Sequence, residues 1–275
     1  MTTPADPGPG RRPRDDAAET AFEPRAAAGL ALPSGEIQLW AVALDPPPEV
    51  VESLGRSLAP DEWERARRFR FERHRRRYVV GRGALRALLG GYLGILPREV
   101  AFSYGARGKP FLAGPAATAS ALSFNLSNSH ELALVGFLRG QEIGVDVEHL
   151  KPMPDLEQIA ERFFSPSERL ALRRLPALQK PEGFFNCWTR KEAYLKARGE
   201  GIATGLRDVS VSFAEAPTTS LTDRRDSSAS AWRLHALPMP EGYAGCAACD
   251  DAERLVMCLS VRLDKDEVQL EPFIR

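Results

Sequence analysis

Three short segments with β-strand character follow one another between residues 122 and 150, and they constrain the fold more than any other feature. They read LSFNLSNS, ELALVGFLR and QEIGVDVEHL, with a turn between each pair. Strands joined by short turns pair in the antiparallel direction, so this region predicts an antiparallel sheet. Helical patterns on both sides exclude an all-β protein.

Helices followed by short strands occur twice along the chain. Residues 36–44 predict a first strand, residues 48–93 are helical in pattern, and residues 100–112 predict strand, turn and strand. In the second half SPSE marks a helix start, a further helix ends at Gly199, and the remainder is mostly β-rich. We therefore predict an α+β protein of two similar units, residues 36–143 and 144–275, with an active cleft between them.

Composition limits the classes of function. Residues 1–35 are rich in proline, alanine and glycine and predict a disordered leader. No segment approaches the roughly 20 apolar residues of a membrane span, and no secretory signal is apparent, so we expect a cytoplasmic protein without a membrane partner. The 37 basic and 37 acidic residues cancel, so total charge gives no reason to expect a nucleic-acid partner.

Two of the four cysteines, Cys246 and Cys249, form a C-x-x-C motif without a second pair at zinc-finger spacing. The sequence leaves two interpretations open, a redox pair or small buried thiols in a reducing compartment.

The stretch GVDVEH places two carboxylates on one side of a predicted strand. Val145 and Val147 face one side, while Gly144, Asp146 and Glu148 face the other. Like charges two residues apart repel unless water or a cation screens them. An edge strand with solvated acids is the alternative.

The stretch WTRKEAYLK predicts a helix on which Trp188, Glu192 and Lys196 share a face. Glu192 and Lys196 alone would make an ordinary surface ion pair. Brought beside the strand, Glu192 would instead complete an oxygen-ligand set with Asp146 and Glu148 that suits Mg²⁺. Lys191 and Lys196 would then neutralise the charge of a phosphorylated substrate.

Further phosphate contacts come from other stretches. RGKP presents Lys109 in a tight turn, FNLSNSH supplies amide, hydroxyl and backbone N–H groups, and residues 64–77 contain eight arginines. The arginine-rich stretch has two alternatives, a solvated helix face or a nucleic-acid patch.

These stretches, in this order, resemble the 4'-phosphopantetheinyl transferases of the surfactin-synthetase-activating (Sfp-like) family. GVDVE and WTRKEAYLK resemble its G-[IV]-D-x-E and W-[ST]-x-K-E-x-x-x-K signature, and RGKPFL, FNLSNS and RFRFERHRRRYVVGR resemble its upstream elements. The resemblance covers about residues 60–205.

The resemblance implies a pseudo-twofold axis between the two halves and coenzyme A in the cleft between them. It implies transfer of the phosphopantetheine arm to a serine of an apo carrier protein, with release of adenosine 3',5'-bisphosphate. By resemblance Asp146, Glu148 and Glu192 hold Mg²⁺, Glu192, Lys196 and Asp146 are catalytic, and the coenzyme is bound by Arg65, Arg73, Lys109, Ser127, Asn128, Lys191 and Lys196.

One position departs from the family pattern. Asn128 stands where the family usually has histidine, and it can donate an amide N–H to phosphate but cannot carry a positive charge. Either Asn128 binds more weakly or nearby arginines compensate, and we expect His130 to be a turn residue. A nucleic-acid-binding module built on an Arg65–Arg77 basic helix is the alternative function. We expect a monomer, since two internal halves close the cleft without a partner.

Overall fold

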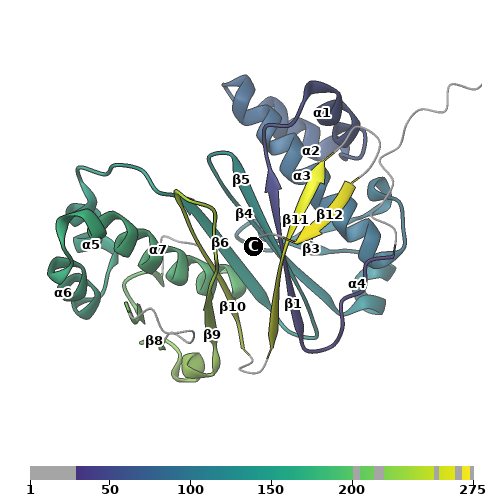
Figure 1. Ribbon diagram of the computed structural model, residues 1–275. Helices are drawn as coiled ribbons and strands as arrows, with labels where there is room; N and C mark the ends of the chain where they lie inside the picture. Colours follow the sequence, from purple (N-terminus) through teal and green to yellow (C-terminus); the bar gives the residue numbers. More distant parts are fainter. Residues whose placement is uncertain (1–28, 201–204, 214–219, 251–253, 264–267, 273–275) are drawn as a thin grey trace, which may run out of the picture.

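The structure is a computed structural model that describes residues 29–200, 205–213, 220–250, 254–263 and 268–272. Residues 1–28 of the expected leader lie outside this part of the chain. Figure 1 shows two sheets beside each other, with α1–α3 at the first sheet and α5–α7 at the second. None of the helices in the described ranges combines the length and the apolar character that a bilayer crossing requires.

The first sheet has five strands in the order β12-β11-β1-β5-β4. Their bounds are β1 Glu36–Ala43, β4 Leu122–Ser129, β5 Leu132–Arg139, β11 Leu255–Leu263 and β12 Val268–Pro272. β4 and β5 pair in the antiparallel direction, as predicted, and β1 also pairs antiparallel with β5, whereas β1 and β11 run parallel. The third segment of the predicted sheet does not pair with β5, because residues 143–149 belong to the second sheet. His130 has a positive φ of 54° in the β4–β5 turn, which agrees with its prediction as a turn residue.

Three helices, α1 (Pro48–Gly55), α2 (Pro60–Arg67) and α3 (Glu72–Leu93), precede the β2–β3 hairpin, which is formed by Phe102–Tyr104 and Pro110–Leu112. A short α4 (Pro115–Ser120) leads into β4. Apolar residues of α3, such as Leu85 and Leu88, pack in one core with Trp40, Phe124 and Phe137 of the sheet. The α3 helix therefore covers one face of the first sheet.

The second sheet has three strands in the order β6-β10-β9. They are β6 Ile143–His149, β10 Tyr243–Cys249 and β9 Arg233–Ala236, and β7 (Val209–Val211) and β8 (Leu221–Asp223) form a separate hairpin. Three helices accompany this half, α5 (Leu156–Phe163), α6 (Pro166–Arg174) and α7 (Lys180–Ala197). Ser165 and Glu168 form the predicted capping box, and Gly199 follows α7 with φ at +68°.

A third apolar cluster lies between the two sheets. Ile37, Leu39 and Leu134 of the first sheet pack with Val145 and Val147 of β6. Strand alternation then turns the neighbouring Asp146 toward the opposite face of β6, where α7 lies. Because the valines of GVDVEH are buried between the sheets, Asp146 lies on the face of β6 that packs against α7.

Three expectations about organisation need correction. β11 and β12 belong to the sheet of the first half, although the division at residue 143 put them in the second. Leu32, assigned to the leader, is buried in the core with α3 and β1. The single basic helix over residues 65–77 is interrupted, because α2 ends at Arg67 and α3 begins at Glu72.

Cys246 and Cys249 are both buried thiols in β10, and they are not joined in a disulfide. Residues three apart on a strand point to opposite faces, so the two thiols cannot form a disulfide without rearranging the strand. Burial raises the pKa of the Cys246 thiol to about 12. These observations favour buried structural thiols over a redox pair.

Gly144 allows α7 to approach β6 closely. A Cβ at this position would overlap the Ala193 carbonyl oxygen and the Ala197 amide nitrogen, both backbone atoms of α7. We expect Gly144→Ala to push α7 away and to lower the free energy of unfolding by about 1–3 kcal/mol, measured by urea denaturation.

Gly81→Ala is the matched control for that measurement. Gly81 lies inside α3, and its added Cβ would meet only Leu44, at an ordinary 3.5 Å. Since alanine is the better helix former, we expect this variant to be neutral or about 1 kcal/mol more stable. Equal stability of the two variants would contradict the close-approach role of Gly144.

Candidate active site

The α7 helix brings Glu192 and Lys196 to the face of β6 that carries Asp146. Glu192 and Lys196 are four residues apart, so they lie one above the other on the helix. Asp146 is 1% exposed and Glu192 is 4% exposed. Asp146 is therefore not a solvated acid, although β6 is an edge strand, and Glu192 and Lys196 do not form an ordinary surface ion pair.

The Lys196 ammonium lies at the centre of this group. Its Nζ is 2.5 Å from Asp146 Oδ1 and 3.7 Å from Glu192 Oε2, and it donates to Ser127 Oγ at 2.8 Å. Ser127 Oγ in turn donates to Asp146 Oδ1 at 2.8 Å. The site therefore joins β4, β6 and α7.

Mutual repulsion and burial perturb the carboxylates. Burial raises the pKa of Glu192 to about 7, and the charges of Asp146 and Glu148 act in the same direction. Burial also raises the pKa of Asp146 against the opposing effects of Lys196 and Ser127, and it raises the pKa of Glu148. Burial disfavours the charged Lys196, but Asp146 and Glu192 outweigh it and raise the pKa of the ammonium. Lys196 is the cation that acts on all three carboxylates, and Lys151 acts in addition on Glu148. The raised pKa values of the three carboxyl groups show that these cations do not fully compensate their burial and mutual repulsion.

The raised pKa of Glu192 predicts how stability of the metal-free protein depends on pH. Its ordinary pKa is 4.5 and its folded value is about 7, so the folded protein holds this proton more tightly than the unfolded chain. The contribution of Glu192 is therefore fully present below pH 4.5 and is lost as the pH rises through 7. We expect the free energy of unfolding, measured without divalent ions, to fall across this window and to fall less in Glu192→Gln. An equal fall in both proteins would contradict the assignment.

The carboxylates of Asp146, Glu148 and Glu192 are a suitable ligand set for a hard divalent cation. Asp146 Oδ2 is buried and has no hydrogen-bond partner among the described residues, which is costly unless another ligand binds it. Carboxylate oxygens are the ligands that Mg²⁺ prefers. Within the described ranges, no three His, Cys, Asp or Glu side chains are already gathered at metal-binding geometry. Asp146, Glu148 and Glu192 would therefore have to adjust around an ion that shares the site with Lys196.

A groove of about 530 Å³ leads away from Lys196 between the two halves. The last turn of α7 contributes Lys196, and the residues after the helix contribute Gly199 and Glu200. The first half contributes, among others, Arg65, Tyr78, Arg82, Tyr104, Lys109 and Asn128. The groove therefore presents several cations next to the carboxylate cluster. The cleft predicted between the halves lies here.

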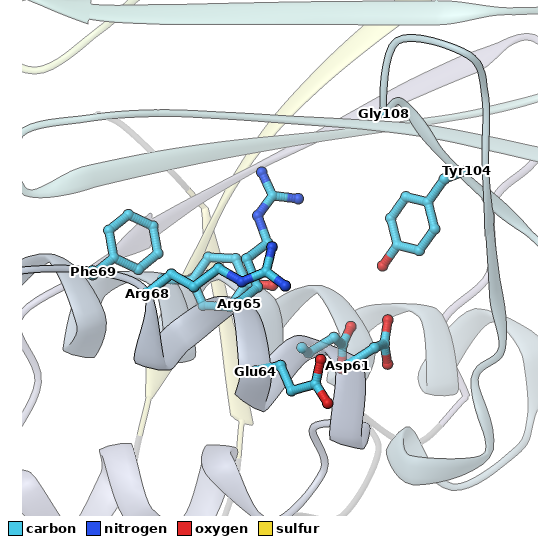
Figure 2. A pocket seen from close by; sticks show the side chains of 9 residues that line it. Asp61, Glu64, Arg65, Arg68, Phe69, Tyr104 and Gly108 are labelled. Carbon is cyan, nitrogen blue, oxygen red and sulfur yellow. The ribbon is translucent and has the colours of Figure 1, made fainter.

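A second cavity of about 590 Å³ continues this groove and shares Arg65, Phe69, Tyr78, Tyr104 and Gly108 with it. Figure 2 shows Asp61, Glu64 and the two arginines Arg65 and Arg68 on the side of α2, with Tyr104 and Gly108 of the β2–β3 hairpin across the cavity. The Arg65 guanidinium lies 5.6 Å from the centre of the Tyr78 ring. Arg65 thus belongs to both cavities.

Several residues that were predicted to contact coenzyme A bind other residues of the protein. Lys109 lines the groove, but its ammonium binds Glu142 at 2.7 Å and the Ala197 carbonyl at 2.8 Å. Ser127 is buried, and its hydroxyl contacts Asp146 and Lys196, so its role as a phosphate ligand stays a prediction. Arg73 lines a neighbouring cavity of about 410 Å³, and Asn128 lines both that cavity and the groove.

The prediction that Lys191 lies at the phosphates is wrong. Its side chain is fully buried, and its ammonium binds Glu168 at 2.5 Å and the Phe163 carbonyl at 3.3 Å. Glu168 also accepts from the backbone N–H groups of Ser165 and Val211. Lys191 therefore ties α7 to α6 and β7 inside the second half.

The sequence interpretation missed Asn125 and Ser129, whose side chains bind β6. It also assigned no role to Tyr78 and Tyr104, which line the groove. The signal for Asn125 and Ser129 was present, because FNLSNS has polar residues at every second position of a strand.

Comparison with known proteins adds independent information. A family model described as the 4'-phosphopantetheinyl transferase superfamily matches residues 142–248. A second, described as 4'-phosphopantetheinyl transferase, N-terminal, matches residues 43–137. The two models together cover both halves of the groove.

Three curated relatives illustrate the similarity. The 4'-phosphopantetheinyl transferase HetI of Nostoc sp. is 46% identical over 205 residues, which is 74% of this chain and 84% of the relative. The putative 4'-phosphopantetheinyl transferase slr0495 of Synechocystis sp. is 34% identical over 202 residues, covering 74% and 80% of the two chains. The 4'-phosphopantetheinyl transferase Sfp of Bacillus subtilis is 29% identical over 178 residues, covering 64% and 76%.

Proposed function

The chain belongs to the 4'-phosphopantetheinyl transferase superfamily, and we propose that it moves the 4'-phosphopantetheine arm of coenzyme A to a serine hydroxyl of an apo carrier protein. The products are the holo carrier and adenosine 3',5'-bisphosphate. One observation carries the proposal: Glu192 and Lys196 of α7 meet Asp146 of β6 at the end of a cationic groove. Such a site combines acids for a divalent ion with cations for phosphates.

Coenzyme A occupies the groove in this proposal. Lys196 lies at the end next to the carboxylates, so the pyrophosphate belongs there. Arg65, Asn128 and Arg73 line the groove and the adjoining cavities, where they are placed to receive the rest of the nucleotide. Lys109 acts indirectly, since its ammonium holds the end of α7 through the Ala197 carbonyl.

Asp146 and Glu192 are the proposed Mg²⁺ ligands, with Glu148 bound directly or through water. The buried, unpartnered Asp146 Oδ2 supports this assignment. When bound, Mg²⁺ polarises the pyrophosphate and neutralises its charge. Phosphoryl transfer depends mainly on positioning and charge neutralisation, which this set of residues supplies.

The side chains have distinct roles in the transfer step. The carrier serine oxygen attacks the phosphorus atom that bears pantetheine, and the bond from this phosphorus to the bridging oxygen breaks. Glu192, or a water that it orients, accepts the serine proton. Lys196 stabilises the negative charge that develops on the leaving oxygen.

The chain is similar to HetI and to Sfp over most of the length of each relative, which supports an enzyme in which one chain contains both α+β halves. We propose the surfactin-synthetase-activating type on this basis, together with the motif resemblance. A monomeric state and a cytoplasmic location stay predictions from the sequence. The carrier that is modified in the cell is a separate question, which a panel of competing carriers answers.

Incubation with coenzyme A, Mg²⁺ and an apo carrier tests the proposed function. We expect the carrier to gain the mass of one phosphopantetheine and the gain to require Mg²⁺. No gain with any carrier of a fatty-acid, polyketide, nonribosomal-peptide or lysine-pathway panel would contradict the proposal. If the protein instead bound RNA or DNA in a salt-sensitive manner, the arginines of residues 65–77 would serve the alternative function.

A further inference from the structure

The edges of the two sheets meet at β4 and β6 without sharing a backbone ladder. β4 is the edge of the first sheet and β6 is the edge of the second. Among the described residues, no backbone pairing joins these two strands, although they lie close together. We call this junction, formed by residues 125–129 of β4 and 145–149 of β6, the seam.

Side chains of β4 bridge the seam at every second position. Asn125 Oδ1 accepts the Val145 backbone N–H at 2.9 Å, and Ser127 Oγ donates to Asp146 Oδ1 at 2.8 Å. Ser129 Oγ donates to Glu148 Oε2 at 2.7 Å and accepts the His149 N–H at 3.1 Å. The first half of the protein thus holds the acidic strand of the second half through three polar side chains.

Ser127 and Ser129 make the same kind of contact, Ser127 with the Asp146 carboxylate and Ser129 with the Glu148 carboxylate. Each donates its hydroxyl to one carboxylate oxygen, and at Asp146 the other oxygen is buried and has no partner among the described residues. Ser129 is itself anchored by the His149 N–H, so its hydroxyl has a fixed direction. A carboxylate held in this way has one oxygen engaged and the other left for a further ligand.

We propose that Ser129 is a positioning residue that holds Glu148 by one oxygen and so makes the site select Mg²⁺ over Ca²⁺. This rests on the proposed function, in which Glu148 belongs to the Mg²⁺ site. Mg²⁺ needs near-octahedral geometry with few protein ligands, whereas Ca²⁺ accepts more oxygens and often takes both from one carboxylate. If the Ser129 hydroxyl is removed, both oxygens of Glu148 become available to the ion, and this favours Ca²⁺, the larger of the two.

Metal binding measured without turnover tests the inference. Mn²⁺ is titrated into the protein, free Mn²⁺ is followed by electron paramagnetic resonance, and Mg²⁺ or Ca²⁺ then displaces it. In Ser129→Ala we expect Mg²⁺ affinity to fall about 10-fold, the loss typical of a partner that orients a metal ligand, and Ca²⁺ affinity to fall much less. Ser129→Thr keeps the hydroxyl and should restore the wild-type ratio.

Two further variants distinguish positioning from a general structural effect. Ser123→Ala changes a serine of the same strand that lies before the seam, and it should leave both affinities unchanged. In a Glu148→Gln background, Ser129→Ala should not change the Mg²⁺/Ca²⁺ ratio further, because Ser129 acts through Glu148. If Ser129→Ala is too unstable to measure, Ser129→Cys keeps the size of the side chain but donates only a weak hydrogen bond, and it should lower the Mg²⁺/Ca²⁺ ratio in the same direction.

The experiments distinguish failure of this inference from failure of the proposed function. Equal losses for both ions in Ser129→Ala, or an unchanged ratio, would overturn the inference while the wild-type protein still modifies a carrier. A wild-type protein that binds neither Mn²⁺ nor Mg²⁺ and modifies no carrier would overturn both.

Discussion

Asp146→Ala and Glu192→Ala each abolish transfer, with an expected loss in kcat of at least about 10³-fold, while coenzyme A binding partly survives. The two residues come from different elements, β6 and α7, and both are buried next to Lys196. Removing either one would deprive the proposed divalent ion of a principal ligand. The groove residues that are proposed to receive the nucleotide, such as Arg65, remain in place. Coenzyme A affinity, measured by calorimetry, should therefore fall much less than the rate of carrier mass gain.

Glu182→Ala is the matched control for Glu192→Ala. Glu182 lies in the first turn of the same helix and is exposed, so its loss should leave transfer unchanged. Wild-type turnover in Asp146→Ala or Glu192→Ala would refute their assignment as metal ligands. Loss of transfer in Glu182→Ala as well as in Glu192→Ala would indicate damage to α7 and not to the site.

Lys196→Ala has the second largest expected effect, a loss of about 10²–10³-fold in kcat. The ammonium binds Asp146 and Ser127 and lies near Glu192, so it organises the acids as well as facing the groove. Without it, the buried Asp146 loses its cation, and the pKa of this carboxyl should rise further. The expected signature is a large fall in kcat together with a weaker affinity for divalent ions at neutral pH.

Lys196→Arg should not restore the activity. The planar guanidinium is larger than an ammonium and cannot donate to the same close set of oxygen atoms from the same helix position. Lys180→Ala provides the control, because Lys180 begins the same helix and its ammonium binds the exposed Glu157, away from the site. Full activity of Lys196→Arg would show that a positive charge is sufficient at this position.

Local periodicity predicted the centre of the site well. Strand alternation put Asp146 and Glu148 on the face opposite Val145 and Val147, and the structure has those valines between the sheets. Helix periodicity put Glu192 and Lys196 on one face of α7. Both patterns depend only on neighbouring residues, which is why a single sequence can reveal them.

Partners that come from distant parts of the chain could not be predicted in this way. Lys191 is next to Glu192 in sequence, but the turn of the helix directs it into the second half, where it meets Glu168. Lys109 meets Glu142 and the end of α7, and no spacing in RGKP indicates those partners. The addition of β11 and β12 to the first sheet is likewise a non-local pairing that local pattern does not encode.

A crystal structure with coenzyme A and Mn²⁺ in place of Mg²⁺ tests the central claim most directly, because anomalous scattering locates the ion. We predict one ion at the end of the groove, bound by oxygen atoms of Asp146 and Glu192 at roughly 2.0–2.2 Å and by the pyrophosphate of the coenzyme. An ion bound only by coenzyme and water, with Glu192 turned away from it, would contradict the account.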